Sequence, residues 1–245
     1  MTVLIEAADV RKTYGEKVVL ADVSLSLQAH DVVCLIGSSG SGKSTLLRCL
    51  NLLEDIDDGV IEFEGREISD PRVDRREVRS RMGMVFQSYN LFPHMSVLDN
   101  CTLAPRRVHG VPKAEAEQRA RDLLAQFGLA DQADKHPDRM SGGQQQRTAL
   151  VRALCTQPTL LLLDEITAAL DPELVGDVLT IVKDLAEQGT TMILATHEMA
   201  FARDIATTVC FLDGGRILEQ GPPAEIFTHP QEERTRQFLA RVLGS

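Results

Sequence analysis

The sequence predicts an α/β fold with a parallel β-sheet at its centre. Three short apolar runs, at residues 32–36, 160–163 and 192–195, are bounded by turn or acidic residues, as strands buried on both faces would be. Segments with helical spacing lie between the runs, and strands that alternate with helices are typical of parallel sheets. Each run is much shorter than the roughly 18 residues that a membrane-spanning helix needs.

The other elements follow from spacing and turn residues. Residues 3–5 and 18–27 alternate like exposed strands, and Asp213-Gly214-Gly215 is a hairpin turn, so we expect an antiparallel sheet there. Residues 89–157 contain no apolar run typical of a parallel strand, which predicts a helical insert. Further helices are predicted at 45–53 after a glycine turn, at 114–127 before Gly128, at 144–154, and from an Asp171-Pro172 start to Gly189.

Composition and charge exclude several classes of protein. The chain has 245 residues, of which 43% are apolar and 25% charged, so it is neither disordered nor fibrous. Its net charge of −10 and its lack of Trp argue against a general nucleic-acid binder. The five cysteines form no C-x-x-C pair, which predicts reduced core thiols in a cytosolic chain. The N-terminal segment is not typical of a signal peptide, so any membrane role is expected to be peripheral.

A glycine-rich segment predicts a phosphate site. Residues 37–44 read GSSGSGKS, a match to G-x-x-x-x-G-K-[ST] directly between an apolar strand and a helix. The glycines turn backbone N–H groups inward as an anion nest, Lys43 neutralises phosphate oxygens, and Ser44 offers a hydroxyl to Mg²⁺. A flexible Gly/Ser turn is the alternative. The candidate nucleotide-binding residues are Gly37, Ser38, Ser39, Gly40, Ser41, Gly42, Lys43, Ser44 and Thr45.

Polar residues also follow the apolar runs 160–163 and 192–195 and a further predicted strand at residues 82–86. Asp164 would hold Mg²⁺ through water, and Glu165 would orient and deprotonate the attacking water. Gln87 would bridge metal and water, and His197 would contact the γ-phosphate. The alternative for Asp164 and Glu165 is that they solvate a strand end or cap a helix, whereas Gln87 or His197 taken singly is more often an ordinary polar residue at a strand end.

A second glycine pair opens a helix in the predicted insert. Ser141 and Gln144 have the S-x-x-Q spacing of a capping box, which is a sufficient local explanation. However, Gly142 and Gly143 leave backbone N–H groups open at a helix N-terminus. They form a second candidate anion site, for which the chain's own phosphate loop has no evident need.

The order of these motifs resembles that of the ATP-binding-cassette ATPases. The segments GSSGSGKS, the Gln87 loop, MSGGQQQR, LLLLDE, the Ala169-Leu170-Asp171 turn and His197 occur in that order. NLLEDIDDG, MVFQSYNLFPHMSVLDN, THEMAFARDIA and FLDGGRILEQGPP are more closely similar to ATPase subunits of bacterial importers of polar amino acids. The resemblance implies a P-loop NTPase (RecA-like) core with an N-terminal antiparallel β subdomain. It also implies one nucleotide-binding domain over 1–245, with a core of 1–88 and 158–245 and a helical subdomain of 89–157.

The resemblance further implies ATP, Mg²⁺ and several partners. ATP bound at Lys43 of one subunit would be covered by residues 141–144 of a second copy, with the Asp171 turn across the interface. Tyr14 would stack on adenine, unless it is simply a surface tyrosine. Residues 87–95 would receive a membrane permease at the cytoplasmic face of the membrane, and an external binding protein would deliver the solute. Self-packing of that segment is the alternative.

The sequence departs from the family pattern next to the catalytic acid. The usual DEPTSALD reads DEITAALD, with Ile166 in place of Pro and Ala168 in place of Ser. Because proline fixes the backbone angle φ, we expect Ile166 to leave Glu165 less rigidly positioned. Ser38 instead of Pro and Met140 instead of Leu are expected to be neutral.

The leading hypothesis is therefore the ATP-hydrolysing subunit of an importer for a polar amino acid. One alternative is a soluble cassette ATPase that acts on ribosomes or DNA, but such proteins usually carry two cassettes or a coiled-coil insertion. Another, motivated by Ile166, is a nucleotide-binding regulatory module without turnover.

Overall fold

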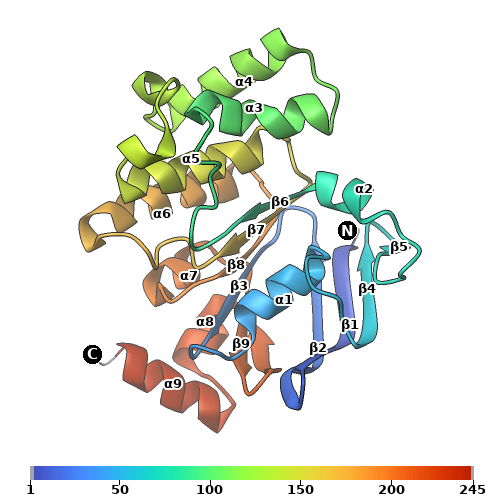
Figure 1. Ribbon diagram of the computed structural model, residues 1–245. Coiled ribbons are helices and arrows are strands. Elements are labelled where there is room, and N and C mark those ends of the chain that lie inside the picture. Colours follow the sequence, from blue (N-terminus) through green and yellow to red (C-terminus); the bar gives the residue numbers. More distant parts are fainter. Residues whose placement is uncertain (1–2, 244–245) are drawn as a thin grey trace.

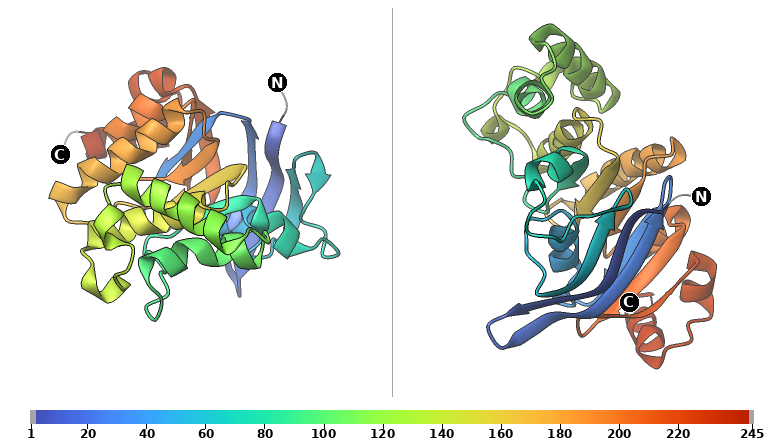
Figure 2. Two further views of the ribbon diagram at one scale, coloured as in Figure 1. Left: turned by 90° about the horizontal axis from the view of Figure 1, so that it is seen from above. Right: turned by 90° about the vertical axis from the view of Figure 1, so that its right-hand side faces the viewer.

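The computed structural model describes residues 3–243, which form two β-sheets with helices packed around them (Figures 1 and 2). Residues 1 and 2, which belong to the segment that we expect not to be a signal peptide, lie outside the described part. The strands are β1 (Val3–Tyr14), β2 (Lys17–Gln28), β3 (Val32–Gly37), β4 (Asp58–Phe63), β5 (Arg66–Glu67), β6 (Met82–Val85), β7 (Leu160–Asp164), β8 (Met192–Ala195), β9 (Thr208–Asp213) and β10 (Arg216–Gly221).

The six-stranded sheet carries the predicted parallel strands at its centre. Its order is β10-β9-β3-β8-β7-β6, and β9, β3, β8, β7 and β6 all run parallel. Every residue of β3, β7 and β8 is buried, as their continuous apolar runs predict. The carboxyl ends of these strands therefore meet at one edge of the sheet, where the candidate site residues follow.

The four-stranded sheet, of order β2-β1-β4-β5, is antiparallel, as its N-terminal alternation predicts. The Asp213-Gly214-Gly215 turn does form a hairpin between β9 and β10. The expectation that this hairpin lies in the antiparallel sheet is wrong, because β9 pairs in parallel with β3. A turn sequence specifies only how its own two strands pair, and the buried run 209–212 gives β9 a place inside the parallel sheet.

The helices are α1 (Lys43–Leu50), α2 (Arg75–Ser80), α3 (Val97–Arg107), α4 (Lys113–Gln126), α5 (Gly142–Leu154), α6 (Pro172–Glu187), α7 (Met199–Ile205), α8 (Pro223–Thr228) and α9 (Glu233–Leu243), with short 3₁₀ turns at Ala130–Gln132 and Pro137–Arg139. The expected helix at 45–53 is shifted. It begins earlier because Gly42, with φ of 111°, is already its N-cap, and it ends earlier because Leu52 adopts a φ of 52°.

Residues 97–154 carry α3, α4 and α5 and no strand among them, as expected for a helical insert. Figure 1 shows these helices at one end of the molecule, away from the antiparallel sheet. Two apolar clusters cover the two faces of the central sheet, and all five cysteines are buried and free, as predicted. In residues 3–243, none of the helices has the length and apolar character to cross a bilayer.

Candidate nucleotide-binding site

The phosphate loop, residues 37–45, joins β3 to α1 at the carboxyl edge of the six-stranded sheet. Two of its glycines are required by geometry. Gly37 has φ of 148°, and a Cβ there would lie 2.1 Å from the Leu212 carbonyl oxygen. Gly42 has φ of 111°, and a Cβ there would lie 2.8 Å from Leu20 Cδ2. Any side chain at either position would strain the loop or displace its neighbours.

Lys43 begins α1 and is only 3% exposed. Its Nζ atom donates hydrogen bonds to the carbonyl oxygens of Gly37, at 3.0 Å, and Ser38, at 3.2 Å. The same atom lies 3.4 Å from Glu165 Oε1. A buried ammonium group is tolerated only with such partners, and here they hold the charge within the phosphate loop.

Ser44 and Asp164 are joined directly, since Ser44 Oγ donates to Asp164 Oδ1 at 2.6 Å. Burial raises the pKa of the Asp164 carboxyl, and the bond from Ser44 opposes that shift. The sequence placed both residues as metal ligands from separate motifs. The structure brings them together at one point.

Glu165 follows β7 and faces His197, whose Nε2 atom lies 2.9 Å from Glu165 Oε1. This contact is the main cause that holds the pKa of the Glu165 carboxyl below its ordinary value, and Lys43 acts in the same direction. Glu165 is therefore a carboxylate at neutral pH and accepts hydrogen bonds.

A cavity of about 370 Å³ lies beside the phosphate loop. Of the predicted site residues, it is lined by Tyr14, Ser39, Gly40, Gly42, Lys43, Ser44, Thr45, Gln87 and Glu165. Asp164 and His197 do not line the cavity. They contact two residues that do, Ser44 and Glu165 respectively. Gly37 and Ser38 hold Lys43 through their carbonyl groups.

One wall of the cavity comes from the β1–β2 hairpin. Tyr14 is 46% exposed there, with Lys12 Nζ 5.3 Å from the centre of its ring. Lys17 also lines the cavity and is not among the residues predicted from the sequence. In the sequence, Lys17 is distinguished only by its place three residues after Tyr14. That spacing does not predict a site residue, because it is the fold that brings the hairpin to the phosphate loop.

Two observations indicate that the site can hold a nucleotide with Mg²⁺. The Ser41 hydroxyl oxygen is buried in the phosphate loop and has no hydrogen-bond partner among the described residues. Ser44, Gln87 and Asp164 offer oxygen ligands, the kind that Mg²⁺ prefers, with phosphates completing its shell. Residues 3–243 contain no cluster of His, Cys, Asp and Glu that would hold a metal alone.

Residues 141–144 lie apart from this cavity and do not line it. They start α5 with the predicted capping box: Gln144 N–H donates to Ser141 Oγ at 3.3 Å, and Ser141 N–H donates to Gln144 Oε1 at 3.0 Å. Beside them, Tyr89 donates from its hydroxyl to the Ala169 carbonyl oxygen at 3.1 Å. Within one chain, the second glycine pair and the phosphate loop thus stay separate.

The segment 87–95 is partly packed and partly exposed. Tyr89 and Leu91 pack against the core, whereas Phe92 is 42% exposed. Phe92 lines a larger cavity, of about 830 Å³, together with residues of α2, α3 and α5. This groove lies between the helical insert and the central sheet, on a different part of the surface from the phosphate loop.

Comparison with known proteins identifies the class to which this fold and site belong. A family model described as ABC transporter matches residues 20–168. The chain belongs to the ABC transporter family, as one of its ATP-binding, ATP-hydrolysing subunits. The phosphate loop (residues 37–45), β7 and Glu165 fall within the matched region.

Three relatives carry names of transport proteins. The glutamine transport ATP-binding protein of Geobacillus stearothermophilus is 48% identical over 96% of this chain and 97% of its own. The protein of that name in Escherichia coli is 48% identical over 98% of this chain and 100% of its own. The general L-amino acid transport ATP-binding protein of Rhizobium johnstonii is 46% identical over 98% and 94%.

Two solved structures are similar in fold. A dimeric post-hydrolysis state of an ATP-binding cassette, bound to ADP and Pi, has a TM-score of 0.80 at 31% identity, over 90% of this chain and 99% of that one. A dimeric bacterial ABC transporter cassette has a TM-score of 0.81 at 31% identity, over 90% and 99%. The predicted fold class is confirmed.

Proposed function

We propose that this chain hydrolyses ATP to drive uptake of a polar amino acid through a membrane permease. Relatives that are 46–48% identical over nearly their full length are named as glutamine or general amino-acid transport proteins. The observation that carries the catalytic part is the convergence of Lys43 and His197 on one oxygen of Glu165, beside the phosphate loop.

Each residue has a distinct role in this proposal. Lys43 neutralises the β- and γ-phosphate oxygens of ATP, and Glu165 accepts the proton of the attacking water. His197 holds the Glu165 carboxylate and contacts the γ-phosphate, while Gln87 contacts the attacking water. Mg²⁺, held by Ser44, Gln87 and, through water, Asp164, would neutralise charge on the phosphates. Tyr14 stacks on the adenine ring.

The proposed active unit is a head-to-tail homodimer. In one chain, Ser141 and Gln144 cap each other's N–H groups at the start of α5, and residues 141–144 do not line the cavity beside the phosphate loop. A second copy related by a two-fold axis would bring that helix start to the γ-phosphate and complete both sites. The dimeric cassettes of similar fold support this arrangement. The Asp171 turn, bonded to Tyr89 through Ala169, would lie across the interface.

The proposed partner of the larger groove is a permease at the cytoplasmic face of the membrane, with an external solute-binding protein beyond it. Phe92 projects into this groove from the segment 87–95, which also carries Gln87. We assign residues 1–88 and 158–245 to a catalytic core and 89–157 to a helical subdomain, so the groove would lie at their boundary. Docking there would link the permease to the Gln87 end of the nucleotide site.

The variant Glu165→Gln tests the proposal. It removes the general base but keeps the size of the side chain, so phosphate release from MgATP should fall by about a hundredfold or more, whereas ATP binding persists. In cells that produce the chain, uptake of labelled glutamine should fall with it. Glu187→Gln, on the exposed face of α6, is the control. Undiminished turnover in Glu165→Gln would refute the assignment of the base.

A further inference from the structure

The residue proposed as general base has an unusual main chain. Glu165 adopts φ of 46°, in the left-handed region that residues other than glycine rarely occupy. Such a conformation persists only where the surrounding structure imposes it. The Glu165 N–H group donates to the Ala195 carbonyl oxygen at 3.0 Å, and its own carbonyl accepts from the Ala168 N–H group at 3.0 Å. These bonds tie the residue to the end of β8 and to the turn that follows.

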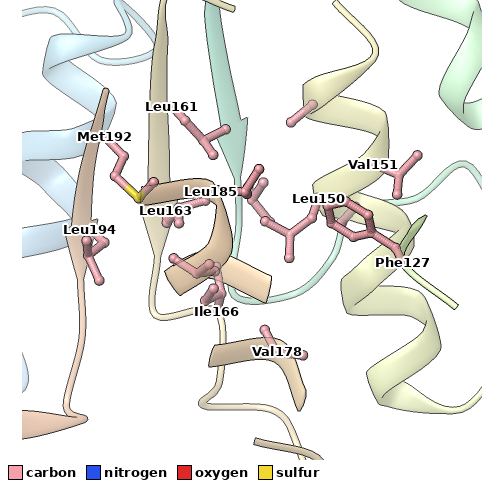
Figure 3. Close-up of a cluster of buried hydrophobic side chains, with 14 of the residues drawn as sticks. Phe127, Leu150, Val151, Leu161, Leu163, Ile166, Val178, Leu185, Met192 and Leu194 are labelled. Carbon is pink, nitrogen blue, oxygen red and sulfur yellow. The ribbon is translucent and has the colours of Figure 1, made fainter. Parts of the chain in front are cut away.

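The next residue is held by packing. Ile166 is only 6% exposed and belongs to the apolar cluster that includes Leu163 of β7, Leu194 of β8 and Val178 of α6 (Figure 3). Because isoleucine is branched at Cβ, its first side-chain torsion is stiff, and burial of the side chain also fixes the direction of its Cα–Cβ bond. That constraint extends to the peptide group between Glu165 and Ile166.

The position of the Glu165 carboxylate depends on the main chain at this residue. Glu165 Oε1 lies 2.9 Å from His197 Nε2 and 3.4 Å from Lys43 Nζ, groups that follow β8 and begin α1. A shift of the main chain at Glu165 would change the position of the carboxylate relative to both partners. Misplacement of a reacting group by about 1 Å is enough to slow catalysis strongly.

We propose that Ile166 is a positioning residue for ATP hydrolysis, whose buried side chain holds Glu165 in the geometry that catalysis needs. The family pattern has proline here, which restricts φ through its ring; in this chain, burial of an aliphatic side chain performs that task. The expectation from sequence was a freer Glu165, but the burial of Ile166 indicates a fixed one. The inference rests on the proposed function, in which Glu165 is the general base.

The test compares two cavity variants of the purified full-length chain with MgATP. Ile166→Ala and Val178→Ala both remove buried methyl groups from the same cluster, and so both should lower the thermal midpoint. Only Ile166→Ala should reduce kcat, by roughly tenfold or more, with the KM for ATP changed less than about twofold. Equal kcat values in the two variants would overturn the proposal, since they would reveal a purely structural role.

Two further variants keep the test decisive. Ile166→Pro restricts the backbone angle φ through the proline ring and should keep kcat well above that of Ile166→Ala. A kcat as low as that of Ile166→Ala would contradict the proposal. If Ile166→Ala does not fold, Ile166→Val replaces it. We then expect a smaller loss of kcat at an unchanged KM, and an unchanged kcat would contradict the proposal. Glu165→Gln runs in parallel: if it retains turnover, the proposed function fails, whereas if only Ile166→Ala retains it, this inference alone fails.

Discussion

Lys43 illustrates how a single buried charge organises the site. Its ammonium group is held by two carbonyl oxygens of the phosphate loop and by the Glu165 carboxylate, so the loop, α1 and the end of β7 are tied at one atom. Removing one member of such a buried set leaves the others without a partner. Lys43 therefore affects both the charge that phosphates meet and the placement of Glu165.

Lys43→Ala should weaken ATP binding by about a hundredfold or more, because it deletes the charge-assisted bonds to the phosphate oxygens. Titration with a fluorescent ATP analogue measures the effect. Lys113→Ala, which removes an exposed lysine paired with Glu117 on α4, controls for net charge. Normal binding by Lys43→Ala would show that the phosphates lie elsewhere.

At this scale, the sequence predicted the residues but not their conformations. The spacing of the phosphate loop was sufficient to select Lys43 and Ser44, because the motif is local. The left-handed backbone of Glu165 and the place of Lys17 in the cavity were not predictable, since each depends on elements distant in sequence. The burial of Ile166 is likewise a tertiary feature, and it is the basis of our proposal that Ile166 holds Glu165 in place.

Two helices of the insert begin alike but are expected to differ in function. Ser96 caps α3 by accepting from the Asp99 N–H group at 3.1 Å, and Ser141 caps α5 by accepting from the Gln144 N–H group at 3.3 Å. Only the start of α5 also carries two glycines, and a Cβ there would lie 3.0 Å from the Tyr89 hydroxyl oxygen at Gly142 and 3.2 Å from Leu174 Cδ1 at Gly143. A comparison of the two helix starts therefore distinguishes capping, which they share, from the nucleotide contact that we propose for α5 alone.

Ser141→Ala and Ser96→Ala should each cost about 1 kcal/mol of stability, because each deletes one capping oxygen. Thermal unfolding measures that cost. Only Ser141→Ala should also reduce ATP turnover, by roughly tenfold, through loss of the contact across the dimer. Equal turnover in the two variants would confine Ser141 to a capping role.

Elements were predictable where their signal is local. The buried strands β3, β7 and β8 and the start of α6 at Asp171-Pro172 follow from apolar runs and capping residues. The sheet to which the β9–β10 hairpin belongs was not predictable, because the pairing of strands far apart in sequence leaves no local signal. Asp171 stands at the N-cap position but its side chain makes no capping bond, which the sequence did not reveal either.

We propose that the molecule presents the two halves of a composite ATP site on separate parts of its surface. The phosphate loop and its cavity lie at the edge of the central sheet, while the helix start at 141–144 belongs to the insert. ATP that contacts both would join two copies, and its hydrolysis would remove the γ-phosphate contact and let them part. A permease seated in the groove beside Phe92 would convert that cycle into transport.

The central claim, that the triphosphate joins two copies of this chain, is tested most directly by the mass of Glu165→Gln in solution with MgATP. Light scattering or sedimentation should show monomers without nucleotide and dimers with it, because ATP then stays intact between the two half-sites. The double variant Lys43→Ala, Glu165→Gln should stay monomeric. Glu165→Gln that binds ATP fully and remains a monomer would contradict the account.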